Sequence, residues 1–302
     1  MNMTVVSLSV ASTFLVVLPE SLYSSRRLDR IPHSGLVLWG SLCGVGWLST
    51  VVFFLRLGID PGATSIWRAM LTFVSHLSDG HPLRGLGLVE VVGLSFSLDI
   101  VVLFGGGLVM VGWQTWRRRG DQRAVIDMVS DESVERAGVG VSLLNHAQPI
   151  AYYLPGRGGR VVLSTGALQL LDDVELGAVL AHELGHHEGH HGLFLVPLQT
   201  LASFVSFLPL SRRAPVAMRE YLEMIADDFA AKKASRGALR SAISKASSFQ
   251  FAPRGAFGIA DQLLERRVRR LDHRVASTLD VVAATTIGAF FVGVGVALVC
   301  VS

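Results

Sequence analysis

Residues 178–186 read AVLAHELGH, and the helix predicted for this stretch organises the interpretation of the whole chain. Asp172, just upstream, is a good N-cap residue, and Glu175 follows three positions later, which is the pattern of a capping box. We therefore predict a helix over about residues 174–189. Residues four apart in a helix lie on nearly the same face, so the two histidines of this stretch point toward one place.

His182 and His186 are these two histidines, and Glu183 lies between them. Two histidines at this spacing, with a glutamate directly after the first, are typical of a zinc site in which the glutamate is the general base. The chemistry expected is attack of a zinc-bound water, activated by Glu183, on the carbonyl carbon of a peptide. A chance match on a polar helix face is the alternative, and the N-cap and the apolar flank of the helix argue against it.

A catalytic zinc site also requires a third protein ligand. The HExxHxxGxxH pattern would supply a further histidine, but Gly192 stands at that position. Glu223, on a later predicted helix, is the favoured ligand, and Asp227, four residues on, is placed to orient a ligand histidine. Glu220 is a less favoured ligand. The alternative for these residues, together with Asp228, is a solvated acidic helix face, and it would be favoured if they were considered without the histidine motif.

Weaker candidates surround the motif. His187, His190 and His191 form a local cluster, one member of which is a candidate for stabilising an oxyanion or for holding an extra metal ion. Arg213 and Arg219 are candidates for the same oxyanion role. We favour the simpler interpretation that the three histidines are exposed polar side chains.

The composition indicates a membrane protein. Of the 302 residues, 50% are hydrophobic and 17% are charged, whereas an ordinary soluble domain has about 25% charged residues. The net charge of +3 is too small to indicate nucleic-acid binding. Cys43 and Cys300 each lie in an apolar run, so neither a disulfide framework nor a CxxC metal pair is expected.

Four apolar stretches are candidate membrane spans, since about 20 apolar residues cross a bilayer. They cover roughly residues 4–19, 35–57, 88–113 and 279–301. The first is the shortest, and no lysine or arginine precedes it. We therefore expect an uncleaved anchor with its N-terminus outside, and not a cleaved signal peptide.

The basic residues fix the expected orientation in the membrane. They cluster at residues 26–30, 117–119 and 266–274. With four spans and the N-terminus outside, all three clusters lie on the cytoplasmic face, as the positive-inside rule requires. The predicted regions are a three-span region at 1–113, a cytoplasmic protease region at 114–278 and a last span at 279–302.

Within the cytoplasmic region we expect a small β-hairpin and several helices. Strands are predicted at 149–154 and 161–163, with a turn at 156–159 between them and a short helix at 164–171. Pro215 suits the first turn of the helix that carries the acidic candidates. The fold class expected is a mainly α membrane protein with a small α+β, zincin-like protease region.

Residues 193–210 form a further apolar stretch, long enough to suggest a fifth span. A full crossing would place Glu223 on the opposite side of the membrane from His182, and one zinc ion cannot be held from both sides. We therefore predict that the stretch is buried, re-entrant or a helical hairpin broken near Pro197 or Pro209.

These motifs resemble those of a known group of enzymes. The sequence AHELGH at 181–186, paired with EMIAD at 223–227, resembles the membrane gluzincin peptidases. The upstream segment AYYLPGRGGRVVLS at 151–164, followed by GAL at 166–168, resembles the BlaR/MecR-type peptidase family, as does the layout of spans around the protease region. HtpX-type membrane proteases share the zinc motifs and are the nearest alternative.

The resemblance implies a zinc endopeptidase facing the cytoplasm, with one Zn²⁺ per chain, that acts in signalling. In that family activation leads, directly or not, to cleavage of a DNA-binding repressor and to self-cleavage. We expect no penicillin-binding sensor domain, since such a domain would follow the last span, which ends near Ser302. A signal is then expected to enter through the spans, the short external loop or a partner.

Several functions remain open at this point. The first is a regulatory integral-membrane zinc endopeptidase that cleaves a repressor, another membrane protein or itself. Its partners would be a protein substrate and membrane lipid, with no direct nucleic-acid binding. The others are a catalytically silent sensor or scaffold with a structural zinc site, an HtpX-like quality-control protease, and a metal transporter. The intact Glu183 and the complete set of candidate ligands favour the first function.

Overall fold

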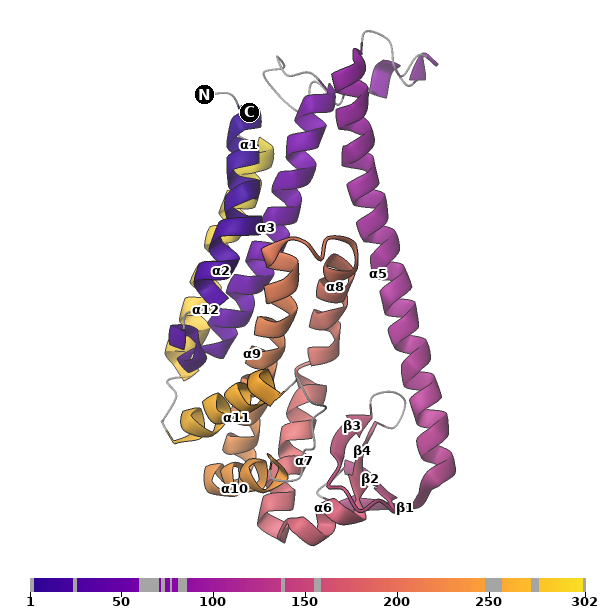
Figure 1. The fold of residues 1–302 in the computed structure, drawn as a ribbon, viewed down its shortest axis with the longest axis vertical. Coiled ribbons are helices and arrows are strands. Elements are labelled where there is room, and N and C mark those ends of the chain that lie inside the picture. Colours follow the sequence, from indigo (N-terminus) through magenta and orange to yellow (C-terminus); the bar gives the residue numbers. More distant parts are fainter. Residues whose placement is uncertain are drawn as a thin grey trace.

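The computed structural model describes residues 3–23, 26–59, 71, 74–76, 78–80, 86–136, 139–154, 159–247, 257–272 and 277–300. Long helices form one end of the molecule, and a small sheet with shorter helices forms the other (Figure 1). The predicted mainly helical fold with a small sheet is confirmed.

The elements are described here in chain order. The helices are α1 (Met3–Ser12), η1 (Thr13–Val17), α2 (Leu18–Tyr23), η2 (Arg26–Arg30), α3 (Pro32–Ile59), α5 (Leu88–Val129), α6 (Thr165–Leu170), α7 (Asp173–Glu188), α8 (His191–Phe204), α9 (Pro209–Lys233), α10 (Arg236–Ser247), α11 (Phe257–Leu271) and α12 (Ser277–Cys300). The strands are β1 (Ser130–Arg136), β2 (Val139–Leu144), β3 (Ala151–Leu154) and β4 (Arg160–Ser164).

Two helices among the described residues are long and apolar enough to cross a membrane, judged by length and composition. They are α3, over Pro32–Gly58, and α5, over Leu88–Val129. Shorter apolar helices cover Leu8–Tyr23 and Asp280–Val294, where the first and last spans are predicted. The four-span layout therefore stays a proposal.

The helix α5 continues well past residue 113, where its predicted span ends. It has 42 residues, and its far end lies beside the sheet (Figure 1). The continuation, residues 114–129, contains four arginines and two glutamines, which are good helix formers, and it contains no proline. One helix thus joins the apolar end of the molecule to the sheet.

The sheet has four strands in the order β1-β2-β4-β3. Strands β2 and β4 are parallel, and the other two pairs are antiparallel. The two predicted strands are present as β3 and β4, whereas β1 and β2 were not predicted. The predicted turn between β3 and β4 lies mostly outside the described residues. Strand β3 forms an edge of the sheet and contacts α7.

The predicted capping box is present at the start of α7. The Asp172 carboxylate accepts from the Val174 and Glu175 N–H groups at 2.9 and 2.8 Å, and Glu175 accepts from the Asp172 N–H at 3.0 Å. Glu175 also accepts from Ser241 Oγ and Lys245 Nζ of α10, both at 2.6 Å. A local capping residue therefore also ties α7 to α10.

The apolar stretch at 193–210 forms most of α8, the turn of a helical hairpin and the start of α9. Helix α8 ends at Phe204, and α9 begins at Pro209, which has no N–H to leave unsatisfied in the first turn. The predicted break near Pro209 is therefore present, whereas Pro197 lies inside α8. The prediction that Pro215 begins a helix is wrong, because α9 has already started six residues earlier and loses only one backbone hydrogen bond there.

Helix α9 packs against α3 through a close contact and a buried cluster. A Cβ atom on Gly35 would lie 2.7 Å from the Tyr221 ring, so only glycine allows this approach. Trp39, Leu42 and Met218 are buried in the same core. The packing fixes α9, and with it the acidic residues that α9 carries.

We expect Glu175→Gln to lower the stability of the detergent-solubilised chain by about 1–2 kcal/mol at neutral pH, because charge-assisted hydrogen bonds are lost. The Lys245 ammonium and the Ser241 hydroxyl hold the pKa of Glu175 at about 2, below the value of about 4.3 for a free glutamate. The stabilisation is therefore complete above pH of about 4.3 and is lost as the pH falls toward the folded-state value.

Thermal unfolding of both proteins from neutral to acidic pH measures this difference, which should narrow below pH of about 4. Glu188→Gln, at the exposed end of the same helix, is the control and should leave the unfolding temperature unchanged. A difference that stays constant with pH would show that the charge of Glu175 is not its cause.

Candidate active site

The structure brings together three of the predicted metal ligands. The Nε2 atoms of His182 and His186 lie 3.2 Å apart on α7. Glu223, from α9, places Oε2 at 3.5 Å from Nε2 of His182 and Oε1 at 3.4 Å from Nε2 of His186. The potential ligand atoms of these three residues all lie within 4.8 Å of one another. Within the described part of the chain, no other group of three histidine, cysteine, aspartate or glutamate residues is placed to hold a metal ion.

The second ring nitrogen of each histidine also meets a polar partner. His182 Nδ1 lies 3.0 Å from Oδ1 of Asp227, although the contact lacks the alignment of a good hydrogen bond. His186 Nδ1 lies 2.7 Å from Nδ1 of His191. Such partners hold a ligand imidazole in one orientation and one tautomer, so both Nε2 atoms are left facing Glu223.

The buried position of His191 beside His186 was not predicted from the sequence. We expected it to be an exposed polar side chain together with His187 and His190, and this is wrong for His191, which is 5% exposed. His190 adopts a left-handed backbone conformation, with φ of 49°, between α7 and α8. That turn brings the first residue of α8 back onto His186.

Glu183 is fixed between α7 and the sheet. Its Oε2 accepts a hydrogen bond from the Tyr153 N–H at 2.9 Å, so the edge strand β3 holds the carboxylate. Burial raises the pKa of Glu183, although the neighbouring His182 and His186 act in the opposite direction. A partly buried carboxylate whose pKa is raised is a better proton acceptor than a fully solvated one.

The charges around the ligand atoms favour a cation. Burial alone would lower the pKa of His182, but the contacts with Asp227 and Glu223 outweigh it and bring the value to about 9. Burial would likewise raise the pKa of Glu223, yet its contacts with His182 and His186 and the Arg267 charge hold it well below its usual range. Two imidazole nitrogens and one carboxylate form a donor set of catalytic zinc sites, which keep one position open.

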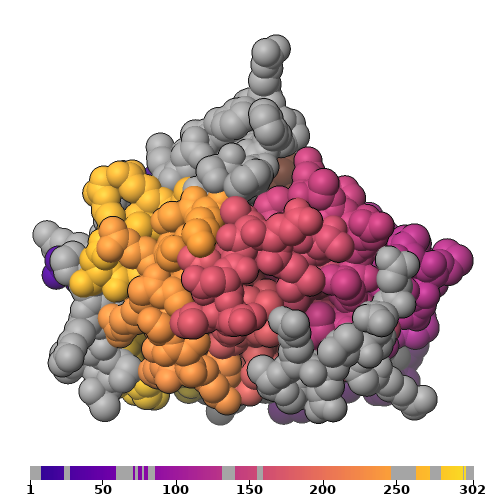
Figure 2. Space-filling model, turned by 90° about the horizontal axis from the view of Figure 1, so that it is seen from below, coloured from indigo at the N-terminus to yellow at the C-terminus, as the bar shows by residue number. Residues whose placement is uncertain are grey.

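A cleft of about 570 Å³ is lined by Glu183, His186 and Glu223. Its wall includes Arg119 and Gln122 from α5, Tyr152 from β3, and Arg219 and His190 among the weaker candidates. Seen from below, the face of the molecule includes the end of α5 and the sheet, α6 and α7, α10, and α11 (Figure 2). The site therefore lies where the protease helices, the sheet and the end of α5 meet.

Two weaker candidates have partners elsewhere. Glu220 is buried and pairs with Arg266, so its carboxylate is not part of the ligand group. Arg213 pairs with Glu20 of α2 at 3.1 Å. Among the arginines considered from sequence for the oxyanion, only Arg219 lines the cleft.

The fold and the site together define a metallopeptidase-like arrangement, and the comparison with known families agrees. Residues 117–278, more than half of the chain, match the profile of peptidase family M48. The chain therefore belongs to peptidase family M48 and is a metallopeptidase. Peptidases of this family are typically zinc-dependent. No curated protein and no solved structure matches the chain. The family match supports the metallopeptidase part of the resemblance and does not extend to the BlaR/MecR type.

We expect Glu223→Ala to remove stoichiometric zinc binding from the purified chain and Glu220→Ala to leave it intact, since only Glu223 faces the two imidazoles. The measurement is zinc content per chain after dialysis, with circular dichroism to show that both variants are folded. Full zinc occupancy in Glu223→Ala would eliminate this residue as the third ligand.

Proposed function

We propose that this chain is an integral-membrane, zinc-dependent endopeptidase. His182, His186 and Glu223 would hold one zinc ion, and Glu183 would be the general base. The observation that carries the proposal is the convergence of the two Nε2 atoms and the Glu223 carboxylate, where Glu183, His186 and Glu223 line an open cleft.

Several residues around the site support the chemistry of peptide hydrolysis. When bound at these atoms, zinc polarises the peptide carbonyl and lowers the pKa of a water molecule. Glu183 takes the proton of the attacking water and returns it to the leaving amine. Strand β3 is a sheet edge whose Tyr153 N–H already meets Glu183, and an edge strand can align an extended peptide. His190 and Arg219 stay candidates for stabilising the oxyanion.

The proposed role is regulatory, through cleavage at specific sites in a repressor, in a membrane protein or in the chain itself. This role comes from the BlaR/MecR resemblance of residues 151–168 and is the finer part of the proposal. An HtpX-like quality-control protease would share the site chemistry but would cleave many unrelated membrane proteins. A catalytically silent sensor would bind zinc and cleave nothing.

The experiment compares protein N-termini in cells that express the wild type or Glu183→Gln. The variant should retain zinc, because the ligands are intact, and should lose proteolysis by a factor of at least about 10³. Termini present only with the wild type would identify the substrates, and one or a few sites would favour the regulatory role. Zinc binding without any wild-type-specific terminus would favour the silent sensor.

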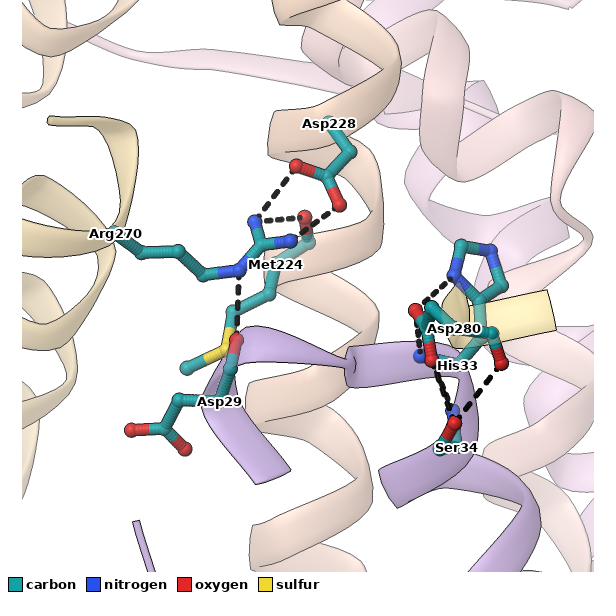
Figure 3. Close-up of polar contacts among 7 residues, drawn as sticks. All are labelled: Asp29, His33, Ser34, Met224, Asp228, Arg270 and Asp280. Carbon is teal, nitrogen blue, oxygen red and sulfur yellow. Dashed lines mark hydrogen bonds and ion pairs between the residues drawn. The ribbon is translucent and has the colours of Figure 1, made fainter. Parts of the chain in front are cut away.

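We also propose the four-span layout with the N-terminus outside. Figure 1 shows α1, α2 and α12 alongside α3, so the two shorter apolar helices complete a bundle. Asp280 near the start of α12 accepts from the N–H groups of His33 and Ser34 at the start of α3, at 3.0 and 2.8 Å (Figure 3). The two helices therefore begin at the same end, as spans two and four of this layout must.

Cysteine labelling in intact cells tests this layout, in a Cys43→Ala, Cys300→Ala background. Ser78→Cys lies between α3 and α5 and Glu188→Cys at the end of α7, and both positions are exposed. A membrane-impermeant maleimide should label Ser78→Cys in intact cells and Glu188→Cys only after lysis. The reverse pattern would overturn the orientation.

A further inference from the structure

The arginines of α11 form a row of ion pairs with the acidic residues of α9. Arg266, Arg267 and Arg270 each contact an acidic side chain of that helix. Arg269, on the same helix, is exposed and, among the described residues, pairs with Glu265 four positions earlier. These residues belong to the basic cluster that the sequence assigned to membrane orientation, and three of them also have partners inside the protein.

Arg267 contacts two residues of the candidate metal site at once. Its Nε and Nη2 donate to the two carboxylate oxygens of Asp227 at 2.8 and 2.7 Å. Its Nη1 lies 3.1 Å from Oε2 of Glu223. Asp227 is in turn the partner of His182. One guanidinium group therefore touches a metal ligand and the residue that orients another.

The neighbouring arginines hold α11 in place without touching the metal site. Arg270 donates to the backbone oxygens of Asp29 and Met224 at 2.7 and 3.1 Å and to Asp228 at 2.8 Å (Figure 3). Arg266 donates to Asp29 at 2.9 Å and pairs with Glu220. Because these contacts fix α11 against both α9 and η2, Arg267 meets the site with a defined geometry.

We propose that Arg267 is a positioning residue for the metal site, which sets the orientation of the Glu223 and Asp227 carboxylates for zinc binding. The inference rests on the proposed zinc-dependent function. Asp227 is 1% exposed and the Arg267 side chain is 15% exposed, so the pair lies largely out of bulk water. A planar, forked group can bridge the two carboxylates, whereas an ammonium or an amide cannot match that geometry.

The test measures zinc affinity and thermal stability separately, in full-length protein in detergent. Glu183→Gln serves as the parent, to exclude self-cleavage. Zinc dissociation constants come from competition with a chromophoric chelator. We expect Arg267→Gln to raise the Kd by about tenfold or more, the usual effect of losing a residue that orients a metal ligand. The zinc Kd of Arg267→Lys should lie between those of the parent and of Arg267→Gln, about threefold or more above the parent value.

Two variants of the same helix are the controls. Arg270→Gln should lower the unfolding temperature yet keep the parent Kd within about twofold, since none of its partners is a candidate ligand. Arg269→Gln should change neither quantity. Should Arg267→Gln not fold, Arg267→Lys carries the test alone.

The outcomes separate this inference from the proposed function. A parent that binds no zinc would overturn the proposed function itself. Zinc binding by the parent with the same Kd in the Arg267 variants would overturn only the positioning role. An equal loss of affinity in Arg267→Gln and Arg270→Gln would also overturn it, because α11 would then act merely as a brace for α9.

Discussion

The structure depends on how it accommodates the negative charge of α9. Glu220 and Asp227 are buried, Glu223 and Asp228 are partly buried, and carboxylates in such positions are costly unless each is paired. The histidines of α7 meet two of them, and the arginines of α11 meet all four. The contacts between α7, α9 and α11 are thus determined largely by charge, and the site lies where the cationic partners from both sides converge.

Most of the correct predictions rest on short sequence patterns. The capping box at Asp172 and the histidine spacing of α7 are set within a few residues, and both survive in the structure. The pairing of Glu223 with the motif followed from chemistry, because a zinc site needs a third ligand. The break at Pro209 followed from the missing N–H of proline.

The rest depends on contacts that a sequence pattern does not encode. His191 reads as one more polar residue in a histidine cluster, and only the left-handed turn at His190 brings it against His186. In the sequence, Arg267 is one member of a basic cluster. Its proposed role depends on the packing of α11 against α9, which brings it to Asp227, 40 residues earlier in the chain. Strand β1 has the sequence SDESVER, whose single apolar residue gives no alternating pattern.

The length of α5 has a mechanical consequence. Its 42 residues form one continuous helix, about 60 Å long at 1.5 Å per residue, and the helix supplies Arg119 and Gln122 to the wall of the cleft. A rod of that length works as a lever. A tilt of about 3° at its apolar end would displace the other end by about 3 Å, roughly the width of a water molecule. The width of the cleft is therefore geometrically linked to the tilt of a helix whose apolar end begins about nine turns before Arg119 and Gln122.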